Sequence, residues 1–342
     1  MQYYADYTAH SRKCVRALVG APVLDIHEPW SNSAGIIFDL FEIEQGIPET
    51  TVAAVVEHLH NNPLSGVILN LSHEQCSAYA DGCEPYITLA QRFPAQQTTV
   101  YSSCEDTLDV IRHHVPGITT TLRYFWERVT RMYLQHSNLA PTPDSTARIS
   151  SLNRRYTPTR ALAIKGLWEC RGHLRYTLGS GDSWGTQTDA QWQHAVWRDS
   201  NYTNAERDEV YKWQRKRQPF QQLKDDAWEF EATFNFVNSA DVALVVESKT
   251  EFSNPRRSSF LTEKTFRPIA MGKPIILVAQ PTAIKDLNSL GYTVLNTEPT
   301  VEDAIATAKR ILCMKPNHYQ QWQRDADIKG RRNQQLWQSR TA

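Results

Sequence analysis

The chain has 342 residues, 41% of them hydrophobic and 22% charged, so it is long enough to bury the cores of two ordinary domains. Its 37 Lys and Arg residues balance 37 Asp and Glu residues, which excludes an overall electrostatic attraction to nucleic acid or to a membrane surface. No apolar run approaches the roughly 18 residues that span a bilayer, and residues 1–20 lack the apolar core of a signal peptide. We therefore expect a soluble, cytoplasmic protein without a membrane partner.

Alternating strands and helices are predicted in the first part of the chain. Apolar runs predict strands over 34–40, 66–71 and 98–102, and the segments between and after them predict helices over 51–60, 87–93 and 105–114. This alternation predicts a parallel sheet with right-handed crossovers. An amphipathic helix over 122–135 and a Pro-rich linker at Pro141–Ser145 should follow, so we expect a first domain over residues 1–140.

A second α/β domain is expected over residues 146–316. Strands are predicted over 148–152 and 174–178, with a helix over 161–170 between them. A polar, Trp-rich insertion follows at about 179–226, and such an excursion is often functional. Helices are expected over 301–314 and 319–337, the last within a terminal segment at 317–342.

The segment from Asp241 to Ala279 is the most informative part of the sequence. Val242–Val246 is a β-branched run typical of a strand buried on both faces. A polar loop follows, Thr262 opens a helix, and Gly272 ends that helix before a strand over 274–278. Ligands of open α/β sheets bind at the carboxyl ends of the strands, where helix N-termini attract phosphates.

This segment resembles the donor-binding half of α-1,3-fucosyltransferases and of related glycosyltransferases of phages and large viruses. The resemblance rests on an apolar strand ending in Glu247, the F-L-T-E-K motif at 260–264 and the G-x-P-I-I strand at 272–276. Where the family has Glu-Asn-Ser, this chain has Glu-Ser-Lys. A weaker match over 150–168 places Arg160 where the family's arginine contacts the donor pyrophosphate. The family has the α/β fold GT-B, two Rossmann-like domains facing across a cleft, and the resemblance implies the same fold here. It also implies that the terminal helix, in the segment 317–342, crosses back to the first domain.

The resemblance also implies an inverting transfer of a sugar from a nucleotide-sugar, such as a UDP- or GDP-sugar, to a hydroxyl. We expect Lys264 and Arg160 to neutralise the departing diphosphate, and Glu247 or Glu263 to accept hydrogen bonds from the ribose. The charges at Glu263 and Lys264 also fit ordinary helix capping, and Arg257 also fits a solvated loop. The donor-binding candidates are Arg155, Arg160, Glu247, Ser248, Arg257, Thr262, Glu263 and Lys264.

The reaction also needs a base that takes a proton from the acceptor hydroxyl. In an inverting GT-B enzyme this base comes from the N-terminal domain. Glu74 follows the strand at 66–71 and is favoured, with Asp25 and Glu28 behind it. Carboxylates at strand ends also serve as helix caps.

No cofactor is expected besides the nucleotide-sugar, because the sequence has no phosphate-binding glycine motif and no metal-ligand cluster. The D-x-D pattern formed by Asp325 and Asp327 lies in the predicted last helix, where we expect it to face solvent. Cationic side chains would therefore replace a metal at the diphosphate. The cysteines lack paired C-x-x-C spacing and favour free thiols in a reducing compartment. They are Cys14, Cys76, Cys83, Cys104, Cys170 and Cys313.

The run from Lys212 to Arg217 alternates basic and aromatic side chains, a composition suited to phosphate contacts and base stacking. It consists of Lys212, Trp213, Gln214, Arg215, Lys216 and Arg217. It also fits a solvated helix face with one packed Trp. Three functions remain open: a glycosyltransferase acting on a hydroxymethylated pyrimidine in phage or viral DNA, one acting on a glycan, lipid or protein hydroxyl, and a non-catalytic binding protein with the same fold. The sequence does not indicate the oligomeric state.

Overall fold

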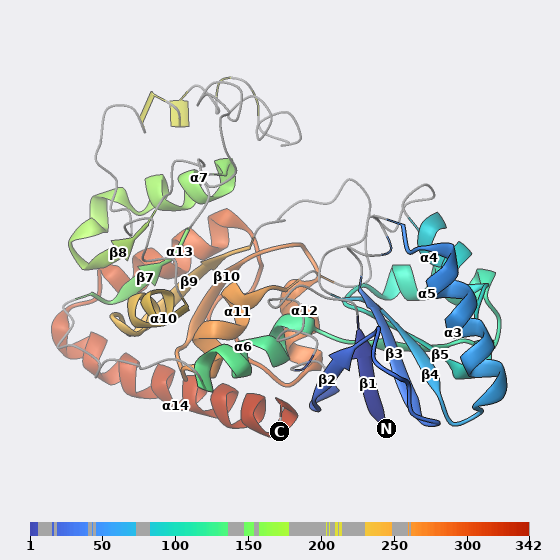
Figure 1. Ribbon diagram of the computed structural model, residues 1–342. Helices are drawn as coiled ribbons and strands as arrows, with labels where there is room; N and C mark the ends of the chain where they lie inside the picture. The colour runs from blue at the N-terminus through green and yellow to red at the C-terminus, as the bar shows by residue number, and fades with distance from the viewer. Residues whose placement is uncertain are drawn as a thin grey trace. The chain divides into compact units, whose positions relative to one another are not determined.

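The computed structural model describes residues 1–5, 16, 19–39, 43, 46–72, 83–135, 147–153, 157–177, 203, 205, 209–210, 212–213, 230–247, 259 and 261–341. The chain divides into two compact units, each with its own sheet (Figure 1). Unit 1 comprises Met1–Met132 with Arg256–Phe260, and unit 2 comprises Tyr133–Pro255 with Leu261–Ala342. The predicted linker at Pro141–Ser145 lies outside the described residues.

Unit 1 is built on a six-stranded parallel sheet in the order β2-β1-β3-β4-β5-β6. All six residues of β3 are buried, as expected for a central strand covered on both faces. Its neighbour β4 pairs Val67 with Ile36 and Leu69 with Phe38. The strands are β1 (Gln2–Ala5), β2 (Val23–Asp25), β3 (Ala34–Asp39), β4 (Gly66–Leu71), β5 (Thr98–Ser102) and β6 (Thr119–Leu122).

Three helices of unit 1 cover one face of this sheet: α3 (Glu49–Asn61), α4 (Glu84–Ala90) and α5 (Glu105–His114). Side chains alternate along a strand, so Ile36 and Phe38 join the core under these helices while Ile37 lies in a smaller cluster on the other face. The short η1 (Ala95–Gln97) leads into β5, and α6 (Phe125–Gln135) follows β6.

Unit 2 is built on a four-stranded parallel sheet in the order β10-β9-β7-β8. Every residue of β9 is buried, because helices cover both faces of this strand. One face packs against α7 and α13, and α10 and α11 lie on the other (Figure 1). The strands are β7 (Ile149–Ser151), β8 (Leu174–Tyr176), β9 (Val242–Val246) and β10 (Ile275–Val278).

The helices of unit 2 are α7 (Pro158–Gly166), η2 (Trp168–His173), α10 (Phe230–Asn238), α11 (Glu263–Ala270), α12 (Ala283–Ser289), α13 (Val301–Leu312) and α14 (Pro316–Thr341). The long α14 packs on α11 through Gly330, where an added Cβ would lie 2.1 Å from the carbonyl oxygen of Gly272. Gly272 has a φ of +70° and ends α11 as predicted. The crossing of the last helix to the first domain stays a prediction.

The α/β class with parallel sheets is confirmed, and the predicted strands β3, β4, β5, β7, β8, β9 and β10 all form. Two parallel Rossmann-like units are the domain composition of the predicted GT-B fold. Six of the described elements were missed: β1, β2, β6, η1, α10 and α12. The missed strands have three or four residues each and do not alternate apolar with polar residues. The helix predicted over 122–135 begins at Phe125, because Thr119–Leu122 forms β6.

Candidate functional site

Glu247 follows the carboxyl end of β9 and is 1% exposed. Its Oε1 accepts hydrogen bonds from the Thr262 backbone N–H (3.0 Å) and from the Thr265 hydroxyl (2.6 Å). Its Oε2 accepts a hydrogen bond from the Thr262 hydroxyl at 2.7 Å. The carboxylate thus binds the first turn of α11 and fixes it against β9. The prediction that Glu247 binds a ribose conflicts with these contacts, because both oxygens are buried and already bound to α11.

The N-terminus of α11 presents Glu263 and Lys264. Thr262 caps the helix, accepting a hydrogen bond from the Lys264 backbone N–H at 3.3 Å. The Lys264 ammonium lies 3.2 Å from both the Thr262 hydroxyl and Glu263 Oε1. The side chains of Lys264 and Glu263 keep 18% and 24% of their surface exposed, so both can reach a ligand.

Glu263 is held in its charged form. Burial alone would raise its pKa, but the positive charges of Lys264 and Arg267, with hydrogen bonds from Lys264 and from its own backbone N–H, outweigh burial and lower the pKa to about 2. At neutral pH, Glu263 is therefore an acceptor of hydrogen bonds, suited to a hydroxyl group and unsuited to a phosphate.

Arg160 comes to the same strand end from α7. Thr157 caps α7 and accepts a hydrogen bond from the Arg160 backbone N–H at 3.2 Å, which places Arg160 in the first turn. Arg160 is 2% exposed, and its guanidinium donates from Nε and Nη2 to the Val246 carbonyl oxygen at 3.4 and 3.3 Å. The structure therefore brings together Arg160, Glu247 and the first turn of α11, as the sequence predicted.

Arg267, one turn further along α11, was not among the residues predicted from the sequence. It is 6% exposed, and its guanidinium lies over the Phe234 ring at 5.4 Å. Burial lowers the pKa of Arg267, although the negative charges of Glu263 and Glu247 act in the opposite direction and raise it. Arg267 follows Glu263 by four residues, and residues i and i+4 are neighbours on a helix. This spacing could have indicated from the sequence that Arg267 lies beside Glu263.

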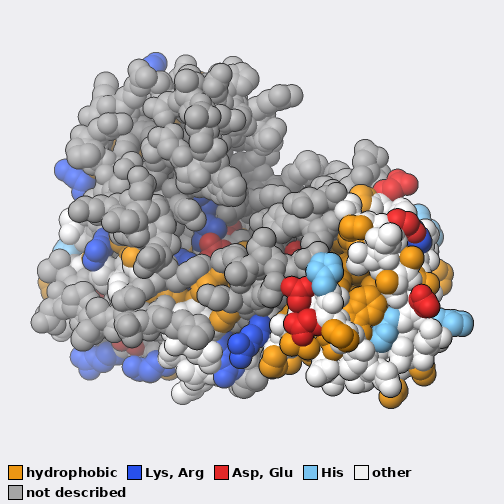
Figure 2. All heavy atoms as spheres, viewed as in Figure 1, with side chains coloured by type: hydrophobic (Ala, Val, Ile, Leu, Met, Phe, Trp, Pro, Cys, Tyr) orange, Lys and Arg blue, Asp and Glu red, His pale blue; other side chains and the backbone are white. Residues whose placement is uncertain are grey.

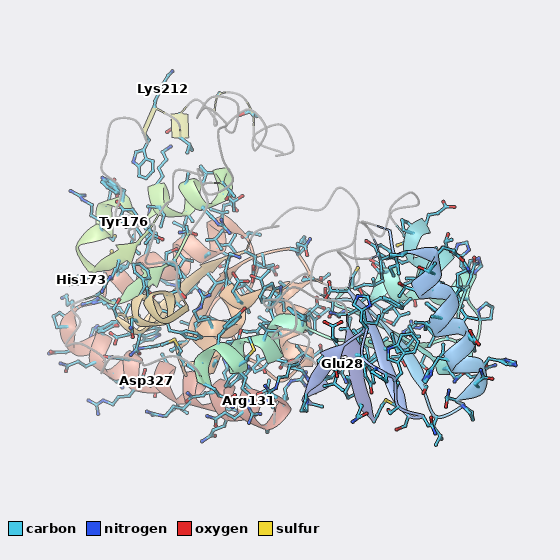
Figure 3. All side chains as sticks on the ribbon, viewed as in Figure 1. Glu28, Arg131, His173, Tyr176, Lys212 and Asp327 are labelled. Atoms are coloured by element: carbon cyan, nitrogen blue, oxygen red, sulfur yellow. The ribbon has the colours of Figure 1, made fainter. Side chains whose placement is uncertain are left out.

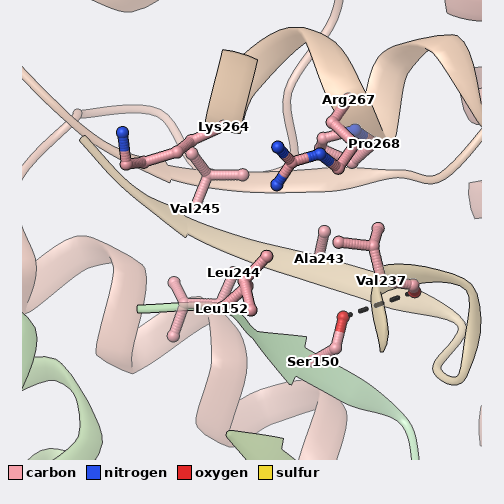
Figure 4. Close-up of a pocket in the computed structure, with 9 residues that line it drawn as sticks. All are labelled: Ser150, Leu152, Val237, Ala243, Leu244, Val245, Lys264, Arg267 and Pro268. Carbon is pink, nitrogen blue, oxygen red and sulfur yellow. Dashed lines mark hydrogen bonds between the residues drawn. The ribbon is translucent and has the colours of Figure 1, made fainter. Parts of the chain in front are cut away.

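A small cavity of about 20 Å³ lies beside Arg267 (Figure 4). Arg267 Nε faces no hydrogen-bond partner within the described residues. The cavity has room for about one water molecule and cannot hold a nucleotide. Its lining residues are Ser150, Leu152, Val237, Ala243, Leu244, Val245, Lys264, Arg267 and Pro268.

Asn153, which follows β7, is a second buried polar residue at this strand end that the sequence did not single out as a site. It is fully buried, and its Nδ2 donates to Ser151 Oγ at 3.0 Å. Its Oδ1 accepts no hydrogen bond within the part of the chain that the structure describes. Three of the predicted donor-binding residues, Arg155, Ser248 and Arg257, lie outside the described residues.

The predicted bases belong to unit 1. Asp25 ends β2 and accepts a hydrogen bond from the His27 backbone N–H at 3.1 Å, while Glu28 is exposed in the following turn (Figure 3). Glu74 lies outside the described residues. Asp39 at the end of β3, which was not among the predicted bases, is a buried carboxylate that accepts a hydrogen bond from Asn70 Nδ2 at 3.0 Å.

The predicted acceptor run is described only at its first two residues. Lys212 is exposed and points away from the sheet (Figure 3). Trp213 is 8% exposed and packs in the core of unit 2, edge-on to Trp168 at 5.3 Å. The prediction that Trp213 stacks on an acceptor is therefore wrong, and the packed-Trp alternative is correct for this residue. Arg215, Lys216 and Arg217 lie outside the described residues.

Within the described ranges, no group of three or more His, Cys, Asp or Glu residues could hold a metal ion. No described helix is long and apolar enough to cross a membrane. Asp325 is exposed on α14 as predicted, but Asp327 is half-buried. Burial and the nearby charge of Asp241 raise the pKa of Asp327.

No protein-family model and no curated protein matches the sequence. Similar solved structures include a Glycosylation Associate Protein (Gap123) complex from Streptococcus agalactiae, with 12% identity and a TM-score of 0.44 over 91% of this chain. The match covers 54% of that protein's chain, so this chain spans about half its length.

Two further solved structures match over nearly the whole chain. A DNA-modifying β-glucosyltransferase, solved in the presence and absence of uridine diphosphoglucose, has 9% identity and a TM-score of 0.47, with 100% of this chain and 95% of that chain covered. The N-terminal domain of Candida albicans trehalose-6-phosphate phosphatase has 8% identity and a TM-score of 0.41, with coverages of 99% and 97%. All three similarities are too remote to transfer a function to this chain.

Proposed function

We propose that the chain is a metal-independent, inverting glycosyltransferase of the GT-B type, which moves a sugar from a nucleotide-sugar to a hydroxyl. The observation that carries this proposal is the convergence of Arg160 and Lys264 on the carboxyl end of β9. Ligands of parallel α/β sheets bind at this edge. Two cations and a helix N-terminus there suit a diphosphate.

In the proposed reaction, the acceptor hydroxyl attacks the anomeric carbon and the nucleoside diphosphate leaves. Lys264 would exchange its contacts with Thr262 and Glu263 for a phosphate oxygen and stabilise the charge that develops on the leaving group. Arg160 is buried and bound to the Val246 carbonyl oxygen, so it would support the same charge through its electrostatic field from the first turn of α7 rather than by direct contact. Arg155 and Arg257 remain further candidates for phosphate contacts.

The two carboxylates of the site take different roles in this proposal. Glu263 is partly exposed and ionised, so it is the candidate acceptor for ribose hydroxyls. Glu247 is a positioning residue, because its three hydrogen bonds set the place of the α11 N-terminus. The base would come from unit 1, with Glu74 first, then Asp25 and Glu28.

A screen of UDP-, GDP- and CMP-sugars tests the proposal. The purified chain is incubated with each donor, with and without DNA that contains hydroxymethylcytosine, and released nucleotide and transferred sugar are both measured. Release of nucleotide from one class of donor supports a transferase. Binding of a nucleotide-sugar with neither hydrolysis nor transfer would favour the non-catalytic alternative, and no binding of any donor would contradict the proposed site.

Hydroxymethylated DNA is the first acceptor to test, since Lys212, Arg215, Lys216 and Arg217 supply four cations within six residues. Replacing Arg215, Lys216 and Arg217 with Gln should weaken DNA binding and reduce its salt dependence, while donor hydrolysis stays unchanged. Unaltered DNA affinity would redirect the search to glycan, lipid or protein hydroxyls.

A matched control removes three other positive charges. Lys and Arg side chains gather along the lower edge of the face shown in Figure 2, where α14 lies. Arg324, Arg331 and Arg332 are exposed on this helix. Their triple replacement with Gln changes the net charge by the same amount, so a loss of DNA binding confined to the first variant identifies the Lys212–Arg217 run.

A further inference from the structure

Cys170 and Cys313 lie side by side in unit 2, although 143 positions separate them in the sequence. Cys170 belongs to η2, and Cys313 is the residue that caps the C-terminus of α13. Their Sγ atoms are 3.1 Å apart, within hydrogen-bonding distance for two thiols. Long-range packing, rather than local sequence, therefore creates a dithiol pair.

The backbone around both cysteines is fixed by described contacts. Arg148 Nη1 donates to the carbonyl oxygens of Ile311, Leu312 and Met314 at 2.8, 3.1 and 2.8 Å, which holds the end of α13 on both sides of Cys313. The Cys170 backbone N–H donates to the Leu167 carbonyl oxygen at 3.0 Å. The two sulfurs are consequently held together before any bond forms between them.

α7 and α13 also pack closely beside the pair. A Cβ added to Gly166 at the end of α7 would lie 2.3 Å from Ile305 Cδ1 of α13. The segments η2 and α13 are also in contact with each other, so a covalent link between η2 and the end of α13 would not separate packed elements.

Solvent exposure distinguishes this pair from the other described cysteines. Cys313 is exposed and Cys170 is partly exposed, whereas Cys83 and Cys104 are buried. The hydrogen bond with Cys313 and burial raise the pKa of the Cys170 thiol. The exposed Cys313 is accordingly the sulfur that a reagent in solution meets first.

We propose that Cys170 and Cys313 form a reversible oxidation site that takes small disulfides, such as oxidised glutathione, as its oxidant. The Cys313 thiolate attacks one sulfur of oxidised glutathione, the S–S bond of glutathione breaks, and one glutathione thiolate leaves. Cys170 then loses its proton and attacks Cys313 Sγ, displacing the second glutathione thiolate. One protein disulfide forms, the oxidant is reduced to two thiols, and the two cysteine protons pass to them.

The link would close a loop of more than a hundred residues that contains β9 and α11. Cross-linking of a long loop stabilises a protein chiefly by restricting its unfolded chain. Oxidation should therefore raise the melting temperature of the chain, and reduction should reverse the change.

The test incubates the full chain with oxidised glutathione, blocks the remaining thiols, and maps peptides by mass spectrometry before and after reduction. We expect an intramolecular Cys170–Cys313 disulfide, loss of two titratable thiols, and a higher melting temperature that dithiothreitol reverses. A linked pair formed by other cysteines, or two unmodified thiols at 170 and 313, would overturn the proposal.

Single Ser variants provide the matched controls. Cys170→Ser should stop at a glutathione adduct on Cys313, because the resolving thiol is missing, and its melting temperature should not rise. Cys313→Ser should react more slowly, because Cys170 is less exposed. Equal adduct formation in both variants would contradict the assigned order of attack. None of these measurements uses sugar transfer, so their outcome is independent of the proposed function.

Discussion

Lys264 is the residue on which the proposed chemistry depends most directly. Its side chain is 18% exposed, and its ammonium lies 3.2 Å from the Thr262 hydroxyl and from Glu263 Oε1. Lys264→Ala should lower turnover by about two orders of magnitude, the effect of removing a group that stabilises developing charge. Steady-state rates with the donor found in the screen measure this. Lys285→Ala, an exposed lysine of α12, is the matched control, and normal rates with normal donor affinity in Lys264→Ala would refute the role.

Glu247 should affect stability more than ligand contact. Glu247→Gln keeps the shape of the side chain but replaces one acceptor oxygen by an NH₂ group, which faces the Thr262 hydroxyl. The resulting mismatch should cost about 1–3 kcal/mol of unfolding free energy, measurable by urea denaturation. Glu302→Gln, an exposed carboxylate of α13, should change it little. Equal values for the two variants would contradict the positioning role.

The lowered pKa of Glu263 predicts that the stability of the chain depends on pH. The pKa of Glu263 falls from 4.5 to about 2 on folding. A lowered folded-state pKa stabilises the protein above the unfolded-state value, and this contribution is lost as the pH falls from about 4.5 towards 2. The difference in unfolding free energy between the parent chain and Glu263→Gln should therefore shrink over this interval. A difference that stays constant between pH 5 and pH 2.5, by denaturant titration, would contradict the assigned pKa.

At the scale of elements, α14 is docked on α11 and on the segment after α12 by close contact and by side-chain amides. Gln334 Nε2 donates to the Ala270 carbonyl oxygen at 2.8 Å, and Asn333 Nδ2 donates to the Thr293 carbonyl oxygen at 2.7 Å. Gly330 allows the approach, because it has no side chain. α14 thus stabilises the position of α11, the helix whose N-terminus forms the candidate site.

Gly330→Ala should weaken this docking. The new Cβ would lie 2.1 Å from Gly272 O and 3.0 Å from Pro274 Cδ, so the two segments must separate. We expect a loss of about 1–3 kcal/mol, typical of overpacking, and a lower melting temperature. Gly172→Ala is the control, since a Cβ there meets no atom within 4 Å. Equal melting temperatures for the two variants would show that α14 is not packed this way.

At the scale of the whole molecule, the proposed reaction divides its groups between two units. The residues of the proposed donor site belong to unit 2, and the predicted base belongs to unit 1. A base variant should therefore abolish transfer while donor binding stays nearly intact.

Glu74→Gln keeps the size of the side chain but cannot take a proton. Transfer should fall by about a hundredfold or more, with nucleotide affinity unchanged in a calorimetric titration. Asp25→Asn is the parallel variant. Should Glu74→Gln transfer sugar normally while Asp25→Asn is inactive, the base is Asp25.

The sequence by itself determined the α/β class, most of the buried strands and the residues around α11. Apolar runs and helix caps are local signals, so β9, α11 and Gly272 could be predicted from a few neighbouring residues. Short strands such as β2 gave no such signal. The motif order also predicted that Arg160 and Lys264 would share one strand end.

Only the tertiary structure decided what those residues bind. Glu247 accepts its hydrogen bonds from residues 15 and 18 positions away, Arg160 donates to a carbonyl 86 positions away, and the two thiols meet across 143 positions. From the sequence, Trp213 could be expected in a core or on a binding surface, because its chemistry suits both. Local sequence patterns indicate burial and periodicity. The contact partners of a side chain depend instead on packing between segments that are distant in the sequence. In this chain, that packing makes Glu247 a positioning residue and Trp213 a core residue.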